Sequence, residues 1–264
     1  SKKCGKDAVA LQVEWGQPIR GEQIRAKLKE GGFDAVTLIH NETSTGVMSP
    51  IEEIAEVMRE FPETLLIVDS VSSFSVLPLP MDELGIDVLL TGSQKALAMP
   101  PGLALFSASA KAFAKAETVK GRGYYFDFLE FKKNQEQDMT PSTPSISHIY
   151  ALQSKLDDIF TEGVAARHAR HAELNEMVHA WVRRHGFEFF APEGYRSKSL
   201  TCVANNKHID VAGLLKNLKD KHGFIIDGGY GKIKGETFRI SNMGDETKDT
   251  IAELIAALDD SLPG

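Results

Sequence analysis

Short apolar runs alternate with helix-like segments along the first 110 residues, and this alternation constrains the fold more than any other feature. Such alternation is typical of a mostly parallel sheet, because a crossover, usually a helix, must connect each strand to the next parallel one. We therefore predict an α/β fold. The second expected helix opens with Ser49-Pro50, which predicts an N-cap followed by proline at the first helical position. The expected strands are residues 8–14, 35–40, 65–69, 88–91 and 103–107, and the expected helices are residues 21–30, 49–60 and 108–120.

The alternation stops after residue 120. Residues 121–145 combine aromatic side chains with a proline-punctuated run, which predicts a long functional loop. A helical pattern then covers residues 145–185, and a smaller α+β unit follows. We predict a large domain over residues 1–145, and a linker helix with a small domain over residues 146–264. The expected strands of the second part are residues 187–190, 199–204, 224–227 and 237–241, with helices at 210–221 and 246–260.

Composition excludes several classes of function. The 264 residues carry a formal net charge of -7, unlike the basic surface of a nucleic-acid-binding protein. No apolar run approaches the roughly 20 residues that span a bilayer. The two cysteines, Cys4 and Cys202, form no C-x-x-C pair, so we expect neither a disulfide framework nor a zinc site. This usage favours a reducing compartment, and we predict a cytoplasmic protein.

Two charged residues follow apolar runs that we expect to be strands. Asp69 ends one run, and Lys95 follows the next in the segment T-G-S-Q-K. The carboxyl ends of strands border the ligand crevice in open α/β sheets, so we expect both side chains there. A desolvated lysine is a candidate Schiff-base nucleophile, and an aspartate is the partner that a pyridinium nitrogen requires. The alternative is that Lys95 solvates a loop and Asp69 caps a helix.

Two further polar segments extend the candidate site. Residues 40–46, H-N-E-T-S-T-G, gather hydroxyls and amides at the end of an apolar run, where they form either a ligand-binding edge or a cap and turn. Residues 228–235 are rich in glycine, but their spacing matches neither common nucleotide-phosphate loop. We predict a hairpin that delivers Arg239, whose forked guanidinium suits a carboxylate. The alternative for Arg239 is a surface salt bridge.

The long helical pattern contains two histidines, His168 and His171, three residues apart on one face. Such a pair can begin a metal site. Its neighbours are basic and supply no carboxylate or thiolate ligand, so we expect a solvated basic face and no metal.

Taken in order, five segments resemble a known family: H-N-E-T-S-T-G, V-D-S-V-S-S, G-S-Q-K-A-L, P-P-G-L and G-x-x-F-R-I-x-x-M-G. They resemble the class V aminotransferases of fold type I, within them the alanine-glyoxylate, serine-glyoxylate and serine-pyruvate group, over nearly the whole chain. The resemblance implies the PLP-transferase fold, with a cofactor-binding large domain. It also implies transamination between a small amino acid (alanine, serine or glycine type) and a 2-oxo acid (glyoxylate or pyruvate type).

The same resemblance implies a site for pyridoxal 5′-phosphate. Lys95 would form the Schiff base with the cofactor, and Asp69 would keep the pyridine nitrogen protonated. Arg239 would bind the substrate α-carboxylate. A homodimer with shared active sites is also implied. The other implied cofactor contacts are Val71 on the ring face, Thr43 and Gln94 at the ring edge, and Thr140 and Thr143 at the phosphate of the neighbouring subunit.

Family members carry, ahead of the region V-E-W-G, a segment that binds the cofactor phosphate and stacks on its ring. We expect about a hundred residues, this segment included, to precede this chain.

Three other hypotheses stay open from the sequence. One is a different class V reaction, such as that of a desulfurase or an aminoethylphosphonate transaminase. Another is a hydrolase that uses Ser93 or Ser73 with Lys95 as the base. The third is a cofactor-binding protein with impaired catalysis.

Overall fold

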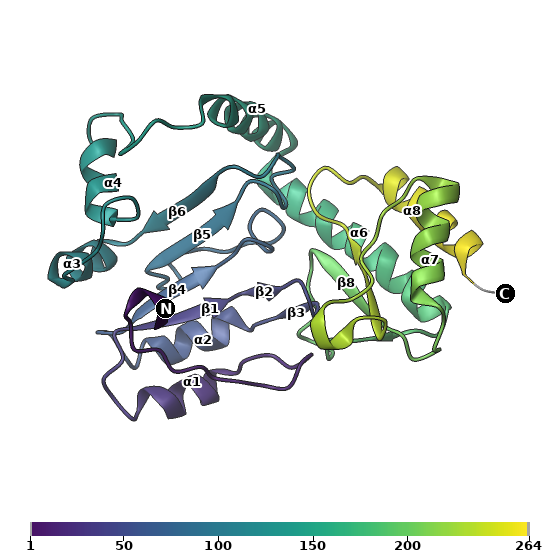
Figure 1. The fold of residues 1–264 in the computed structure, drawn as a ribbon, viewed down its shortest axis with the longest axis horizontal. Helices are drawn as coiled ribbons and strands as arrows, with labels where there is room; N and C mark the ends of the chain where they lie inside the picture. The colour runs from purple at the N-terminus through teal and green to yellow at the C-terminus, as the bar shows by residue number, and fades with distance from the viewer. Residues whose placement is uncertain (1, 263–264) are drawn as a thin grey trace.

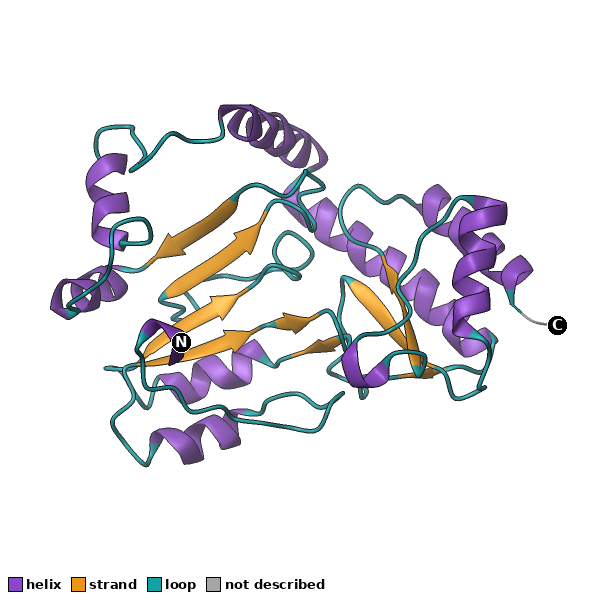
Figure 2. Ribbon diagram, in the orientation of Figure 1, coloured by secondary structure: helices purple, strands orange, loops and turns teal. Residues whose placement is uncertain are grey.

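The computed structural model describes residues 2–262, apart from the side chain of Cys4. Two units lie side by side in it, and helix α6 (Val164–Arg184) runs from their junction into the second (Figures 1 and 2). The purple-to-teal half of the chain in Figure 1 forms the first unit, and the green-to-yellow half forms the second. None of the helices within residues 2–262 is long and apolar enough to cross a membrane.

A four-stranded sheet forms the centre of the first unit. In spatial order its strands are β1 (Ala35–Ile39), β4 (Leu65–Asp69), β5 (Val88–Gly92) and β6 (Ala104–Ala108). The first three run parallel, and β6 is antiparallel to β5, which confirms the prediction of a mostly parallel sheet. The register pairs Asp69 with Ile39 on one side and Leu90 on the other. The carboxyl ends of β1, β4 and β5 therefore meet at one edge of the sheet.

Helices α1 (Gly21–Leu28) and α2 (Ile51–Met58) pack together beside β1 and β4 (Figure 1). Their apolar residues recur at helical spacing and face the sheet. Burial of each such side chain contributes about 1.5–3 kcal/mol to the free energy of folding. This packing fixes the sheet from which the site residues project. The most buried members of the cluster are Ile24, Ile51, Ile54, Ala55, Val57, Leu66, Val68 and Ile86.

Short elements complete the first unit. A hairpin of β2 (Asn41–Glu42) and β3 (Val47–Met48) continues from β1. Helix α3 (Ala110–Thr118) follows β6 and begins where the Ser109 hydroxyl accepts a hydrogen bond from the Ala112 amide at 3.1 Å. A 3-10 turn at Lys2–Cys4 precedes them in the chain.

The second unit is a smaller α+β layer structure, as predicted. Its sheet order is β7 (Glu188–Phe189), β8 (Leu200–Ala204) and β9 (Thr237–Ser241), all antiparallel. Three helices pack on this sheet: α6, α7 (Val211–Asn217) and α8 (Lys248–Ser261). A π-helical turn at Leu218–His222 extends α7, and a 3-10 turn lies at Gly231–Ile233. The largest fully buried side chains of this core are Leu174, Trp181, Leu214, Leu218, Phe238, Ile240 and Ile251.

The structure contradicts two predicted strands. Residues 8–14 form no strand, and Val9 and Leu11 are 60% and 37% exposed. Their pattern is strand-like, but among the described residues no neighbouring strand pairs with their main chain. Residues 224–227 also form no strand, and only Asp227 makes an isolated antiparallel bridge, to Arg239.

Three helix predictions also need correction. The 145–185 pattern is two helices, α5 (Ile146–Glu162) and α6, because Gly163 between them has a φ of 88° that ends the regular helix. The 121–145 loop contains helix α4 (Phe128–Gln135), which begins where Asp127 caps the Leu129 amide at 3.0 Å. Finally, Pro50 is the N-cap of α2, because the Ser49 hydroxyl donates to the Ile39 carbonyl at 3.1 Å instead.

Candidate active site

Lys95 lies in a tight turn directly after β5. Ser93 holds this turn, since its hydroxyl donates to the Pro100 carbonyl at 2.7 Å and its carbonyl accepts from the Met99 amide at 3.1 Å. Inside the turn the Ala98 amide donates to the Lys95 carbonyl at 2.8 Å. The half-buried Lys95 side chain lines a cavity of about 380 Å³ between the two units. Within residues 2–262 its amine has no ion-pair partner, so the lysine is available to a ligand.

Asp69 ends β4, the strand next to β5. One carboxylate oxygen, Oδ1, accepts a hydrogen bond from the Val71 amide at 2.9 Å. The Ser70 hydroxyl donates to the Leu90 carbonyl at 2.7 Å and thereby fastens this turn to β5. Asp69 and Val71 are both half-buried. The turn therefore presents a carboxylate at the sheet edge from which Lys95 also projects, because β4 and β5 are parallel neighbours.

Arg239 reaches the same region from β9 of the second unit. Its Nη1 donates to the Thr43 carbonyl at 2.8 Å, although the two residues lie 196 positions apart. Its Nη2 forms an ion pair with Asp227 at 2.6 Å. Gly46 allows the β2–β3 hairpin to lie close to β8, since a Cβ at position 46 would be 2.8 Å from the Cβ of Cys202 on that strand. The β2–β3 hairpin and the second unit thus meet at Arg239.

The polar segment 40–46 has mainly a structural role in the described chain. Burial lowers the pKa of His40 to about 4, and its neutral ring lies 2.9 Å from the Ser73 hydroxyl. The Asn41 amide donates to the Ser72 carbonyl at 3.1 Å and to the Ser199 hydroxyl at 3.0 Å. These contacts join the hairpin to the turn after Asp69 and to the second unit, and they leave Thr43 facing the cavity.

The structure brings three of the predicted site residues into one cavity: Thr43, Lys95 and Arg239. Asp69, Val71 and Gln94 belong to the neighbouring turns but do not line it. Thr140 and Thr143 are exposed on the loop between α4 and α5, where the Thr140 hydroxyl donates to the Ser142 carbonyl at 2.6 Å. Sequence reasoning missed Asp227, which also lines the cavity; its place opposite Arg239 depends on a turn that its spacing does not reveal.

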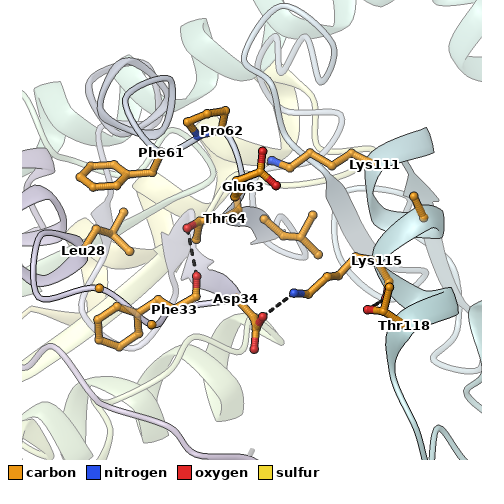
Figure 3. Close-up of a pocket in the computed structure, with 14 residues that line it drawn as sticks. Leu28, Phe33, Asp34, Phe61, Pro62, Glu63, Thr64, Lys111, Lys115 and Thr118 are labelled. Carbon is orange, nitrogen blue, oxygen red and sulfur yellow. Dashed lines mark hydrogen bonds and ion pairs between the residues drawn. The ribbon is translucent and has the colours of Figure 1, made fainter.

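A larger cavity, of about 720 Å³, lies elsewhere on the first unit (Figure 3). Its wall includes Asp34, directly before β1, and Leu65, which starts β4, so it is at the opposite end of the sheet from Lys95. Its lysines are already paired: Lys111 with Asp87 at 3.0 Å and Lys115 with Asp34. None of the predicted site residues lines it, whereas three of them line the smaller cavity.

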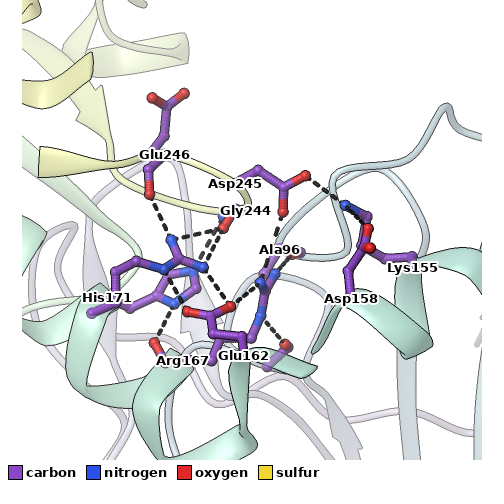
Figure 4. Close-up of polar contacts among 11 residues, drawn as sticks. Ala96, Lys155, Asp158, Glu162, Arg167, His171, Gly244, Asp245 and Glu246 are labelled. Carbon is purple, nitrogen blue, oxygen red and sulfur yellow. Dashed lines mark hydrogen bonds and ion pairs between the residues drawn. The ribbon is translucent and has the colours of Figure 1, made fainter. Parts of the chain in front are cut away.

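Behind the Lys95 turn is a buried polar network at the junction of α5 and α6 (Figure 4). Arg167 is 2% exposed, donates to the Ala96 carbonyl and pairs with Glu162 at 3.1 Å. Arg170 pairs with the same carboxylate at 2.6 Å and donates to the Gly244 carbonyl at 3.2 Å. The hydrogen bond from Arg170, together with that from Arg167, lowers the pKa of Glu162 to about 2. This network clamps the loops that adjoin Lys95 and Arg239.

The predicted solvated basic face on this helix is therefore wrong. His171 is fully buried, and burial lowers its pKa to about 4. Its Nδ1 lies 2.8 Å from the Arg167 carbonyl, and its Nε2 accepts from the Gly244 amide at 3.2 Å. The sequence pattern did not reveal that Glu162, the last residue of α5, pairs with Arg167 and Arg170 across the break at Gly163.

Comparisons with known proteins agree with this architecture. The family model described as "Aminotransferase class-V" matches residues 1–234. An uncharacterized aminotransferase of Methanocaldococcus jannaschii is 39% identical over 244 residues, which cover 90% of this chain. A serine–glyoxylate aminotransferase of Arabidopsis thaliana is 33% identical over 249 residues, or 92% of this chain. The chain spans 62% of the length of each of these two relatives.

Among solved structures, the alanine–glyoxylate aminotransferase of Nostoc sp. superimposes with a TM-score of 0.87 at 30% sequence identity. The match covers 94% of this chain and 66% of that structure. The fold, the order of the motifs and the family match over residues 1–234 lead to the same conclusion. This chain belongs to the class V aminotransferase family.

Proposed function

We propose that the protein containing this chain is a pyridoxal 5′-phosphate-dependent aminotransferase that exchanges an amino group between a small amino acid and a 2-oxo acid. The donor class is that of alanine, serine or glycine, and the acceptor class is that of glyoxylate or pyruvate. One observation carries the proposal: a lysine from a strand end and an arginine from the second unit line one cavity, and a carboxylate lies at the next strand end. The relatives named as serine– and alanine–glyoxylate aminotransferases support the choice of substrates.

The described residues fit the ring end of the cofactor. Lys95 has an amine without an ion-pair partner in a cavity, and Asp69 has one oxygen held by a main-chain amide while the other is free among residues 2–262. An acid at a strand end suits a ring nitrogen, and a lysine in a partly desolvated cavity suits imine chemistry. Val71, Thr43 and Gln94 lie on the adjacent turns and are proposed to border the ring.

Bound pyridoxal phosphate supplies an electron sink for the pair that remains when a Cα–H bond breaks. Asp69 holds a proton at the ring nitrogen, which keeps that sink effective. Arg239 binds the substrate α-carboxylate and orients Cα towards Lys95. The Lys95 amine would remove the proton from Cα and deliver it to the C4′ carbon of the bound cofactor, as a general acid–base catalyst.

The geometry disfavours the rival reactions. Burial raises the pKa of the Cys202 thiol to about 11, so this cysteine in β8 is a poor nucleophile for desulfuration. The Ser93 hydroxyl donates to a main-chain carbonyl, and the Ser73 hydroxyl is buried against His40. Neither serine is aimed at the cavity as a hydrolase nucleophile would be.

We also propose a homodimer in which Thr140 and Thr143 reach the cofactor phosphate of the neighbouring subunit. Both threonines are exposed, and they lie outside the cavity of their own chain. Cys202 is buried and forms no disulfide among the described side chains, which supports a reducing, cytoplasmic setting.

The test is direct labelling of the lysine. The purified protein with pyridoxal phosphate should develop a visible absorption band that borohydride bleaches, with the added mass on Lys95 by peptide mass spectrometry. Lys95→Ala should lose both signals, whereas Lys219→Ala, which changes an exposed lysine outside the cavity, should keep them. Alanine or serine should then shift the band, and glyoxylate or pyruvate should restore it. A label spread over surface lysines, with none on Lys95, would refute the proposal.

A further inference from the structure

Asp227 and Arg239 form an ion pair in the wall of the cavity that Lys95 also lines. Two hydrogen bonds bridge their main chains. The Arg239 amide donates to the Asp227 carbonyl at 2.7 Å, and the Asp227 amide donates to the Arg239 carbonyl at 3.4 Å. Residues directly opposite in an antiparallel bridge project to the same side, so the carboxylate and guanidinium meet without further rearrangement. The Nη2–Oδ2 distance is 2.6 Å.

The loop behind Asp227 holds it in this position. The Gly235 amide donates to the Gly228 carbonyl at 3.1 Å, which closes the loop. Gly229 has a φ of 85°, and a Cβ there would lie 2.4 Å from the Ile233 carbonyl oxygen. The backbone is therefore closely packed next to Asp227, although half of the Asp227 side chain, 52%, is exposed.

The hydrogen-bond donors of Arg239 are partly used already. Nη1 donates to the Thr43 carbonyl, Nη2 contacts Asp227, and Nε is buried without a partner among the described residues. A substrate carboxylate binds an arginine best through two parallel N–H···O bonds. Such a carboxylate must share the Nη2 edge with Asp227 or displace it, and it meets the negative charge of Asp227 as it approaches.

We propose that Asp227 is a specificity-determining carboxylate that weakens monocarboxylate binding at Arg239 and excludes substrates with a second carboxylate. This inference rests on the proposed function, because it assigns Arg239 to the substrate. The cavity wall agrees with it: Phe224, Ile225 and Ile226 are apolar. The other acid in the wall is Glu246, whose carboxylate accepts from the Thr250 hydroxyl at 2.6 Å.

Among the described residues, the cavity wall has no spare cation for a substrate side-chain carboxylate. The cations of the wall are Lys95, which the proposed chemistry uses, and Arg239, which takes the α-carboxylate. A small uncharged side chain meets no charge repulsion at this wall, whereas an acidic one is repelled by Asp227. The substrate class is therefore amino and 2-oxo acids with uncharged side chains.

Calorimetric binding of two unreactive acids, propionate and succinate, tests this without any cofactor. The unaltered protein should bind propionate about tenfold more tightly than succinate. Asp227→Asn keeps the main-chain bridge and should bind propionate roughly three- to tenfold more tightly, the range expected for loss of a partly exposed charge. The preference over succinate should fall to about one. Asp157→Asn, at an exposed aspartate of α5 outside the cavity, should change neither affinity.

Arg239→Lys should weaken both ligands, since it removes the fork. Equal affinities in the unaltered protein and Asp227→Asn, or no propionate binding by either, would overturn the inference. Failure of the proposed function is separate, because it appears as no borohydride label on Lys95. In the loaded enzyme, Asp227→Asn should lower KM for alanine while kcat is kept, and should raise kcat/KM for aspartate.

Discussion

The buried guanidinium of Arg167 donates a hydrogen bond to the main-chain carbonyl of Ala96, the residue directly after Lys95. On the same helix, Arg170 donates to the carbonyls of Gly244 and Glu246, in the loop that follows the strand of Arg239. One helix therefore positions the loops that adjoin both Lys95 and Arg239 (Figure 4). The proposed reaction requires such rigid placement, because Lys95 and Arg239 are proposed to act on one substrate.

Removing the Arg167 guanidinium should cost stability. Arg167→Met keeps much of the side-chain volume but leaves the Ala96 carbonyl and part of the Glu162 charge without a partner. We expect the free energy of unfolding to fall by about 2–4 kcal/mol in urea denaturation. Arg183→Met on the same helix removes an exposed ion pair with Glu176 and should cost at most about 1 kcal/mol. Equal losses would show that the buried contacts of Arg167 contribute nothing special.

Glu162 should make stability fall at acid pH. Its pKa of about 2 in the folded protein lies below its ordinary value of 4.5, because Arg170 and Arg167 bind the charged form. This contribution is complete above pH 4.5 and is lost as the pH falls from about 4.5 to about 2. Glu162→Gln should therefore differ in stability from the unaltered protein by a constant amount above pH 5 and by less below it. A difference that is flat down to pH 2.5, or that matches exposed Glu117→Gln, would contradict this.

Gly244 should resist substitution for two reasons. Its φ is 87°, and a Cβ there would lie 3.2 Å from the Cβ of Ala98 in the Lys95 turn. Gly223→Ala is the matched control, since Gly223 has a φ of 74° with nothing within 4 Å of the added Cβ. We expect thermal unfolding to show a loss of about 1 kcal/mol for Gly223→Ala and about 2–3 kcal/mol for Gly244→Ala. Equal losses would mean that the contact with Ala98 gives way freely.

Asp69→Asn should separate cofactor chemistry from folding. An asparagine keeps an oxygen for the Val71 amide, so the free energy of unfolding should change by less than about 1 kcal/mol. The amide cannot hold a positive ring nitrogen, and we expect the rate of the alanine half-reaction to fall at least roughly 100-fold. Stopped-flow absorbance measures this rate. An unchanged rate would remove Asp69 from the proposed chemistry.

Much of the fold follows from local pattern. The strand prediction at residues 65–69 and that at 237–241 match β4 and β9 in both bounds, because their apolar or alternating residues are buried in the sheets. The placement of Asp69 and Lys95 at one sheet edge follows from the parallel order of β4 and β5. The predictions failed where pairing decided the outcome, as at residues 8–14, whose strand-like pattern has no partner in the described chain.

The sequence by itself determined the α/β order of elements, the family and the candidate lysine, because period, turn residues and motif order are local properties. Only the tertiary structure decided the environment of charged side chains. Arg167 and His171 look like a solvated face, yet they are buried, since Arg167 packs against the Lys95 turn and His171 against the loop at Gly244. Asp227 ends a predicted strand that does not form, yet it faces Arg239 across a main-chain bridge. Such contacts join residues far apart in sequence, and chain packing alone sets their distances.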